Sequence, residues 1–138
     1  MNADRFFMDT AFVLALLNPK DSFHHEAKAL IPRVRRAREV WLHDGILIEV
    51  GNSLAAKDRQ AAVDFIERIY KTGNTKITAV TRKLVKQALG LYGKRLDKAW
   101  GFTECMSFVL MQEEGLFDAL TMDHHFEQVG FRIMLSTQ

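Results

Sequence analysis

The sequence is poor in cysteine: its 138 residues include only Cys105, so no disulfide can form within the chain. This usage is typical of a reducing compartment, and we therefore expect a cytoplasmic protein. Long hydrophobic runs are also lacking, because the apolar segment at residues 11–17 is too short to span a bilayer. Asp4 and Asp9 precede that segment and no small-residue cleavage site follows it, so we expect neither a signal peptide nor a membrane anchor.

Several motifs of well-known enzymes are missing as well. The chain has no Walker A loop, no glycine-rich dinucleotide loop, no Ser-His-Asp set and no catalytic cysteine motif. Internal repeats, low-complexity tracts and linkers are absent from the sequence too. With 48% hydrophobic and 26% charged residues, the composition is that of an ordinary globular protein, and residues 1–138 are predicted to form one domain.

What the chain does have is a regular alternation of short apolar runs with longer segments of helical periodicity. Strands are predicted at residues 5–8, 40–42, 75–80, 116–122 and 131–135. Helices are predicted at 11–17, 23–37, 44–54, 59–72, 82–92 and 98–114, with a basic loop at 93–97 and a helical turn at 124–127. Gly51 weakens its helix, which we interpret as a sign of close packing. Strands that alternate with helices indicate an α/β fold with a mainly parallel sheet.

Four acidic residues lie within or directly after these apolar elements. Asp9 and Asp123 each follow a strand, while Glu49 and Glu104 each interrupt an apolar helix. Acidic side chains are rarely buried unless they are paired, so each of these positions needs an explanation. Ligands of open α/β sheets collect outside the carboxyl ends of the strands, which is where Asp9 and Asp123 are expected. If the two helices converge on the same edge, the four acids form one carboxylate cluster.

Such a cluster would repel itself, because like charges close together raise one another's pKa. A divalent cation removes this repulsion, and Mg²⁺ or Mn²⁺ suits hard oxygen ligands. A bound cation also makes water a better nucleophile for attack on phosphorus. Taken one at a time, the acids have simpler explanations: a helix cap is the favoured role for Asp9 alone, and a cap, a salt bridge or partial exposure would account for any of the others.

Positive charge is concentrated in the middle of the chain. Residues 28–98 contain 16 Lys or Arg against 7 Asp or Glu, whereas residues 99–138 contain 1 against 6. A basic region next to an acidic one suits a polyanion held near a cation site, although solvated helix faces commonly carry the same residues. Candidates for contacts with an RNA backbone are Arg82, Lys83, Lys86, Lys94, Arg95 and Lys98.

Several segments together resemble one known family. They are Phe7-Met8-Asp9-Thr10, Asp21 followed by His24 and His25, Glu49 in its helix, Asp97 with the run 100–107, and the C-terminal run 120–126. In this order they are similar to the PIN domain, and within it to the prokaryotic ribonucleases of the VapC toxin type. The resemblance covers essentially the whole chain, and its most specific part is residues 97–131.

The resemblance implies a PIN-like domain with a five-stranded, mostly parallel sheet between helices. It also implies an endoribonuclease that depends on Mg²⁺ or Mn²⁺, cleaves RNA, forms homodimers and often has an antitoxin partner, as the toxin of a type II toxin–antitoxin pair. The family's acids, which bind the metal and act in catalysis, match Asp9, Glu49, Glu104 and Asp123.

Four further polar residues are predicted to support these acids. Thr10 matches the hydroxyl that usually follows the family's first acid, and Asn52 lies one helical turn after Glu49. Ser107 is a candidate for positioning a phosphate or a water. Asp97, near the predicted start of helix 98–114, is a candidate outer ligand or helix cap.

One position departs from the family pattern. The third acid is usually Asp, and here it is Glu104, whose extra methylene moves the carboxylate by about one ångström or more. The departure bears on rate and metal preference, and it leaves open an alternative function as a catalytically weakened module that binds RNA or protein. Phosphotransfer with Asp9 as nucleophile fits less well, because phosphatases of the haloacid-dehalogenase type need a second Asp where this chain has Ala11. The histidine pairs at 24–25 and 124–125 are interpreted as surface or helix-end residues.

Overall fold

The computed structural model describes residues 3–136 and contains a five-stranded sheet in which every adjacent pair of strands is parallel. The strands are β1 (Arg5–Met8), β2 (Glu39–His43), β3 (Thr75–Thr78), β4 (Asp118–Leu120) and β5 (Arg132–Ile133). Their order across the sheet is β3-β2-β1-β4-β5. The predicted α/β fold with a five-stranded parallel sheet is therefore confirmed.

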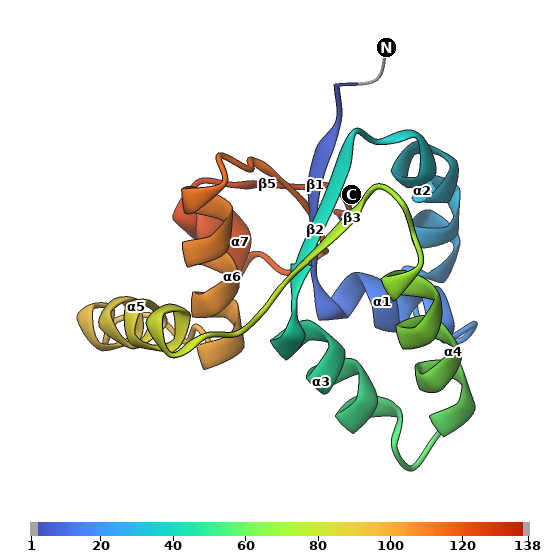
Figure 1. Cartoon of the computed structure of the whole chain (residues 1–138), viewed down its shortest axis with the longest axis horizontal. Coiled ribbons are helices and arrows are strands. Elements are labelled where there is room, and N and C mark those ends of the chain that lie inside the picture. The colour runs from blue at the N-terminus through green and yellow to red at the C-terminus, as the bar shows by residue number, and fades with distance from the viewer. Residues whose placement is uncertain (1–2, 137–138) are drawn as a thin grey trace.

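Helices cover both faces of this sheet. They are α1 (Thr10–Leu17), α2 (His24–Arg36), α3 (Asp44–Leu54), α4 (Arg59–Tyr70), α5 (Arg82–Lys94), α6 (Phe102–Glu113) and α7 (His125–Val129). Figure 1 shows the sheet nearly edge-on, with α1 to α4 on one side and α5 to α7 on the other. Among residues 3–136, no helix combines the length and the apolar character needed to cross a bilayer.

The central strand β1 is covered on both faces, which explains why its sequence is apolar at consecutive positions. Residues 6–8 are all buried. The ring of Phe7 lies 6.2 Å from that of Phe126 in α7, and Phe126 in turn meets Phe108 of α6 edge to face at 4.9 Å between centroids. These aromatic contacts tie β1 to the layer formed by α6 and α7.

The sheet has its topological switch at β1. This strand pairs with β2 on one side and with β4 on the other, so the connections that leave β1 and β4 diverge. A crevice for ligands forms at such a point, outside the carboxyl ends of the strands. Asp9 directly follows β1 and Asp123 closely follows β4, so both acids lie at this crevice.

The predicted helix 98–114 begins later than expected, at Phe102. Gly101 is its N-cap, and the Gly101 N–H donates a hydrogen bond to Glu104 Oε1 at 2.8 Å. The segment before it is held by the Trp100 indole, whose Nε1–H donates to Gln128 Oε1 at 2.8 Å. The last two strands are shorter than predicted, because their ladders extend only over 118–120 and 132–133.

The packing around the two glycines of α3 differs from what the sequence indicates. A Cβ placed on Gly51 would meet nothing within 4 Å, so our interpretation of Gly51 as a close-packing position is wrong. The close approach occurs at Gly45, where a Cβ would lie 2.8 Å from His43 Cε1 and 3.2 Å from Met106 Cε. Gly45 thus lets the start of α3 pack directly against the ring of His43.

Candidate active site

Asp9 lies at the point where β1 ends and is the N-cap residue of α1, but its side chain makes no capping hydrogen bond. Instead Asp9 Oδ2 accepts a hydrogen bond from the hydroxyl of Thr121 at 2.8 Å, and the residue is only 7% exposed. Burial, with smaller contributions from the charges of Asp123 and Glu49, raises the pKa of Asp9 to about 6, although the hydrogen bond from Thr121 lowers it in part. A helix cap alone does not account for this environment.

Glu49 reaches the same edge of the sheet from α3 and is half-buried. The hydroxyl of Thr10, the first residue of α1, donates to Glu49 Oε1 at 2.5 Å. This bond orients the carboxylate toward α1. Asn52, predicted to hold Glu49 from one turn away, is exposed and makes no hydrogen bond with it in the part of the chain that the structure describes. The predicted contact of Asn52 is therefore wrong.

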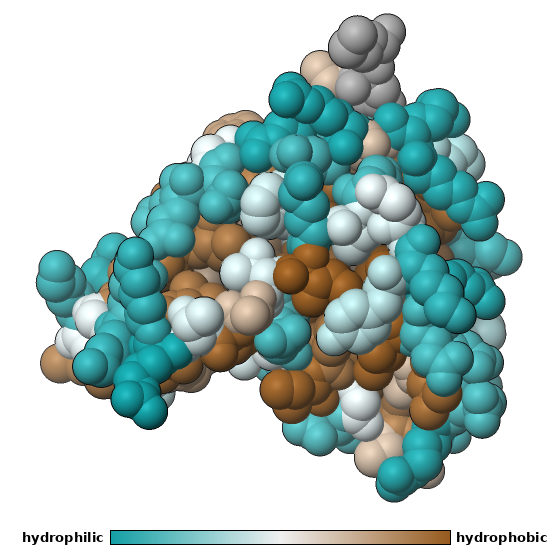
Figure 2. All heavy atoms as spheres, in the orientation of Figure 1, coloured by the Kyte–Doolittle hydropathy of each residue, from teal (hydrophilic) through white to brown (hydrophobic). Residues whose placement is uncertain are grey.

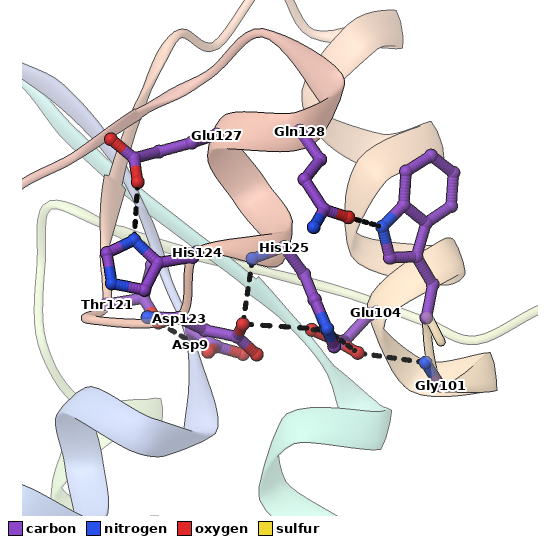
Figure 3. Close-up of polar contacts among 10 residues, drawn as sticks. Asp9, Gly101, Glu104, Thr121, Asp123, His124, His125, Glu127 and Gln128 are labelled. Atoms are coloured by element: carbon purple, nitrogen blue, oxygen red, sulfur yellow. Dashed lines mark hydrogen bonds and ion pairs between the residues drawn. The ribbon is translucent and has the colours of Figure 1, made fainter. Parts of the chain in front are cut away.

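Glu104 of α6 and Asp123 of the loop after β4 approach each other, together with His125 at the start of α7 (Figure 3). Burial raises the pKa of Glu104, and a hydrogen bond with Asp123 raises it further. The opposite holds for Asp123, where burial raises the pKa but hydrogen bonds with Glu104 and the His125 backbone lower it more. Of these two neighbouring carboxyls, Glu104 therefore has the raised pKa and Asp123 the lowered one.

His125 contacts both of these acids. Its Nδ1 lies 3.0 Å from both carboxylate oxygens of Glu104 and 3.5 Å from Asp123 Oδ1, and its backbone N–H donates to Asp123 Oδ1 at 2.9 Å. Burial lowers the pKa of His125, but the hydrogen bond and charge of Glu104 and the charge of Asp123 raise it more.

All four acids line a single cavity of about 380 Å³ at the switch point of the sheet. The structure thus brings together acids from four separate segments of the chain. The residues that line the cavity are Asp9, Thr10, Ala11, Leu14, Glu49, Gly101, Phe102, Thr103, Glu104 and Asp123.

The donor chemistry of this cavity, together with the neighbouring His125, fits a divalent cation. Glu104, Asp123 and His125 each offer one donor atom, and these three atoms lie within 4.8 Å of one another. Carboxylate oxygens are the ligands that Mg²⁺ and Mn²⁺ prefer. A cation would also offset the repulsion among the acids, which contributes to the raised pKa of Asp9.

Asp97 lies elsewhere. It precedes α6, is exposed, and accepts two hydrogen bonds of 3.0 Å from the guanidinium of Arg95. Because Gly101 is the N-cap of α6, the prediction that Asp97 caps this helix is wrong. Asp97 is also not among the residues that line the acidic cavity, so the structure does not support a role as an outer ligand.

Ser107 belongs to a buried hydrogen-bond chain behind the cavity. Its hydroxyl donates to the carbonyl of Thr103 at 3.0 Å and lies 2.9 Å from His43 Nε2. His43 Nδ1 accepts from the Gly45 N–H at 3.0 Å, so the ring proton is on Nε2, which donates to Ser107. Burial lowers the pKa of His43 to about 4 and keeps the ring neutral. The predicted contact of Ser107 with a phosphate or water is wrong, because its side chain is fully buried.

The predicted RNA-contact residues lie on α5 and in the segment that follows it. Arg95 and Lys98 line a second cavity, of about 420 Å³, which shares Gly101 with the acidic cavity. The guanidinium of Arg95 also lies 5.2 Å from the centre of the Trp100 ring. The exposed basic residues on α5 itself are Arg82, Lys83, Lys86 and Lys94.

Sequence reasoning missed two residues of the site. Thr121 is fully buried, donates to Asp9, and accepts from the Asp123 N–H at 3.1 Å. His125 does lie at a helix end, as interpreted, but its ring faces Glu104. No periodicity marks either residue, and the one available signal is their closeness to Asp123 after an apolar strand.

Known proteins resemble this chain over most of its length. The 23S rRNA-specific endonuclease VapC20 of two Mycobacterium tuberculosis strains is 26% identical over 125 residues, which cover 91% of this chain and 94% of the relative. The crystal structure of M. tuberculosis VapC20, a Sarcin-Ricin loop cleaving toxin, superposes with a TM-score of 0.82 at 25% identity and covers 91% of this chain and 95% of VapC20. No family model matches the chain.

Two other solved structures share the fold at lower identity. VapBC2 from Rickettsia felis, bound to a DNA fragment from its promoter, has a TM-score of 0.67 at 9% identity and covers 96% of this chain and 98% of its own. FitAcB from Neisseria gonorrhoeae has a TM-score of 0.64 at 15% identity, and the match covers 94% of this chain and 96% of the FitAcB chain. These two likenesses concern the fold alone.

Proposed function

We propose that this chain, a PIN-domain protein of the VapC type or a close relative, is a metal-dependent endoribonuclease that hydrolyses phosphodiester bonds in RNA. The observation that carries the proposal is the meeting of four acids in one cavity at the switch point of the sheet. The likeness to VapC20 in sequence and structure supports the same activity. Residues 1–138 would act as one nuclease domain.

In this proposal, Mg²⁺ or Mn²⁺ is held by Asp9, Glu49, Glu104 and Asp123. When bound, such a cation lowers the pKa of water and stabilises the negative charge that develops on a phosphodiester. The protein fixes its carboxylates beforehand through neighbouring donors, which is what a precise site requires. These donors are the hydroxyls of Thr121 and Thr10 and the backbone N–H of Gly101.

Basic residues would guide the RNA strand to this cavity. Arg95 and Lys98 line the adjoining cavity, so phosphates bound there lie next to the acids. The exposed basic residues of α5 extend the positive surface farther along α6, on which α5 packs. Because such contacts neutralise phosphates, RNA binding should be strongly salt-dependent.

The test is cleavage of a mixed RNA pool by the purified chain in Mg²⁺, in Mn²⁺ and in EDTA. Asp9→Asn is the active-site variant, and Glu67→Gln, which replaces an exposed acid on α4, is the matched control. We expect cleavage with metal by the unmodified chain and by Glu67→Gln, and a loss of at least about a hundredfold in Asp9→Asn. Cleavage that persists in EDTA or in Asp9→Asn would contradict the proposal.

The alternative is a weakened PIN fold that binds RNA or protein without cutting, and the glutamate at position 104 is the feature that favours it. Under this alternative, the unmodified chain and Asp9→Asn bind RNA equally well and neither cleaves it with any metal. Glu104→Asp separates the two cases, because restored cleavage in this variant would identify the glutamate as the cause of inactivity.

We further propose that the chain is the toxin of a type II pair whose partner is a protein antitoxin. The proposal rests on its likeness to VapC20, a toxin, and on its fold, which it shares with the VapBC2 structure. Induced expression in bacteria should arrest growth, and Asp9→Asn should not. Growth should return when a protein antitoxin that binds the chain is expressed with it. Equal arrest by Asp9→Asn would contradict the toxin role.

A homodimer is also proposed, through the outer face of α5. Val85, Leu89 and Tyr92 lie on this face at helical spacing and remain exposed. Figure 2 shows hydrophobic atoms at the surface of α5 beside hydrophilic ones. Light scattering should give a dimer mass for the unmodified chain and a monomer mass for Leu89→Glu. A dimer mass for both would exclude this face as the interface.

A further inference from the structure

His125 is directed into the site by the way α7 begins. Phe126, the next residue, is fully buried against Phe7 and Phe108, which leaves the rings of His124 and His125 on different sides of it. The ring of His124 is exposed and meets Glu127 Oε1 at 2.6 Å. Figure 3 shows His125 turned the other way, toward Glu104 and Asp123. The position of His125 is thus set by the core rather than by solvent.

The spacing of the donor atoms matches the first coordination sphere of a small cation. In an octahedral site with bonds of about 2.1 Å, neighbouring ligand atoms lie about 3.0 Å apart. His125 Nδ1 lies 3.0 Å from the Glu104 oxygens and 3.5 Å from Asp123 Oδ1. Small side-chain adjustments would therefore place all three donors around one ion.

Building on the proposed function, we propose that His125 Nδ1 is a metal ligand alongside Glu104 and Asp123, and that this nitrogen makes the site prefer Mn²⁺ to Mg²⁺. Imidazole nitrogen is a good ligand for first-row transition ions, whereas Mg²⁺ takes oxygen ligands almost exclusively. In the bound form the ring carries its proton on Nε2 and presents the Nδ1 lone pair to the ion. A site built of carboxylates alone discriminates less between the two ions.

The length of the Glu104 side chain matters in this arrangement. Its carboxylate contacts His125 Nδ1 while it accepts the N–H of Gly101, and the longer side chain spans both. An aspartate is one methylene shorter and would lose at least one of these contacts. Glu104 and His125 therefore act as a pair, and Glu104→Asp should weaken the Mn²⁺ preference as well.

The test measures metal binding to the full chain without RNA. Calorimetric titrations with Mn²⁺ and with Mg²⁺ compare the unmodified chain, His125→Ala and the matched control His124→Ala. Pulsed electron paramagnetic resonance on bound Mn²⁺ then reports whether a ¹⁴N nucleus is coupled to the ion. Circular dichroism in EDTA verifies that each variant is folded.

We expect a ¹⁴N coupling and Mn²⁺ affinity at least about tenfold above that for Mg²⁺ in the unmodified chain and in His124→Ala. His125→Ala should lose the coupling and most of the Mn²⁺ preference while its Mg²⁺ affinity changes little. No ¹⁴N coupling in the unmodified chain, or an equal loss for both ions in His125→Ala, would overturn the proposal and leave His125 as a hydrogen-bond donor to Glu104.

The spectrum of the unmodified chain decides the question even if His125→Ala does not fold. The measurement is also independent of RNA cleavage. If the spectrum shows a coupled nitrogen but the chain cuts no RNA, the proposed ligand set is supported and the proposed nuclease activity is contradicted. If the chain cuts RNA but no nitrogen is coupled, the nuclease activity is supported and the ligand set is contradicted.

Discussion

The side chain of Asp9 is buried beside two other acids, and its pKa of about 6 lies above the ordinary value of 3.8. A pKa that folding raises contributes stability that is fully present below pH 3.8 and is lost as the pH rises through 6. At pH 7, the ionised Asp9 therefore lowers the free energy of unfolding by on the order of 2–3 kcal/mol relative to a neutral side chain.

Asp9→Asn should accordingly make the metal-free protein more stable as it abolishes cleavage. In EDTA at pH 7, we expect the free energy of unfolding to rise by on the order of 2 kcal/mol, with little change at pH 4, where Asp9 is already neutral. Urea denaturation at both pH values measures this, with Glu67→Gln as the control. An equal gain at both pH values would assign it to the amide's hydrogen bonds instead of to the charge.

His43 has the opposite dependence on pH. Its pKa falls from 6.5 to about 4 on folding, so the unfolded chain binds a proton over this range while the folded chain does not. In the Asp9→Asn background, which removes one opposing titration, the protonation of His43 should cost about 3 kcal/mol of stability between pH 6.5 and pH 4, and the raised pKa of Glu104 offsets part of this loss. Adding His43→Gln should flatten the curve, while adding His124→Gln at an exposed site should not. A curve that His43→Gln leaves unchanged would exclude His43 as its source.

At the scale of elements, the start of α3 depends on the absence of a side chain at residue 45. Gly45→Ala would place a Cβ 2.8 Å from Cε1 of the buried His43 ring, and we expect a loss of about 1–3 kcal/mol. Gly51→Ala in the same helix meets no atom within 4 Å and should gain about 0.5–1 kcal/mol. Urea denaturation of the two variants checks both signs. A gain in both would mean that the His43 ring shifts freely.

The elements that carry the acids could be predicted, because each acid breaks a strong apolar pattern. Asp9 and Asp123 follow buried strands, and Glu49 and Glu104 lie within apolar helices, so all four positions stand out in the sequence. The start of α6 could not be predicted from periodicity. It depends on a glycine cap and on a hydrogen bond from Trp100 to the distant α7.

The supporting residues were the least predictable part of the site, because their contacts also join segments that are distant in the sequence. Ser107 lies close to Glu104 in sequence, yet its hydroxyl bonds to a buried histidine that is 64 residues away. Thr121 contacts Asp9 from 112 positions away, and His125 contacts Glu104 from 21 positions away. Local spacing carries no information on such contacts, which arise only when the strands pair.

At the scale of the whole molecule, the uneven charge should govern RNA binding. With the Asp9→Asn protein and single-stranded RNA, Lys86→Gln on α5 should reduce the slope of log affinity against log salt by about 0.7 if Lys86 contacts one phosphate. Lys71→Gln, next to α4 in the other helix layer, should leave it unchanged. Fluorescence anisotropy at several salt concentrations gives both slopes. A larger change in Lys71→Gln would place the RNA on the opposite side of the sheet.

The hydrogen bond from Thr121 to Asp9 joins residues that are 112 positions apart, and it forms only where β4 has paired with β1. Contacts over such a distance along the chain are made late in folding, and during synthesis the N-terminal part emerges first. A growing chain that has not yet reached residue 123 therefore carries Asp9 and Glu49 without Asp123. Until residue 123 has emerged and β4 has joined the sheet, the nascent chain holds only part of the acidic cavity, so the proposed site is completed late in folding.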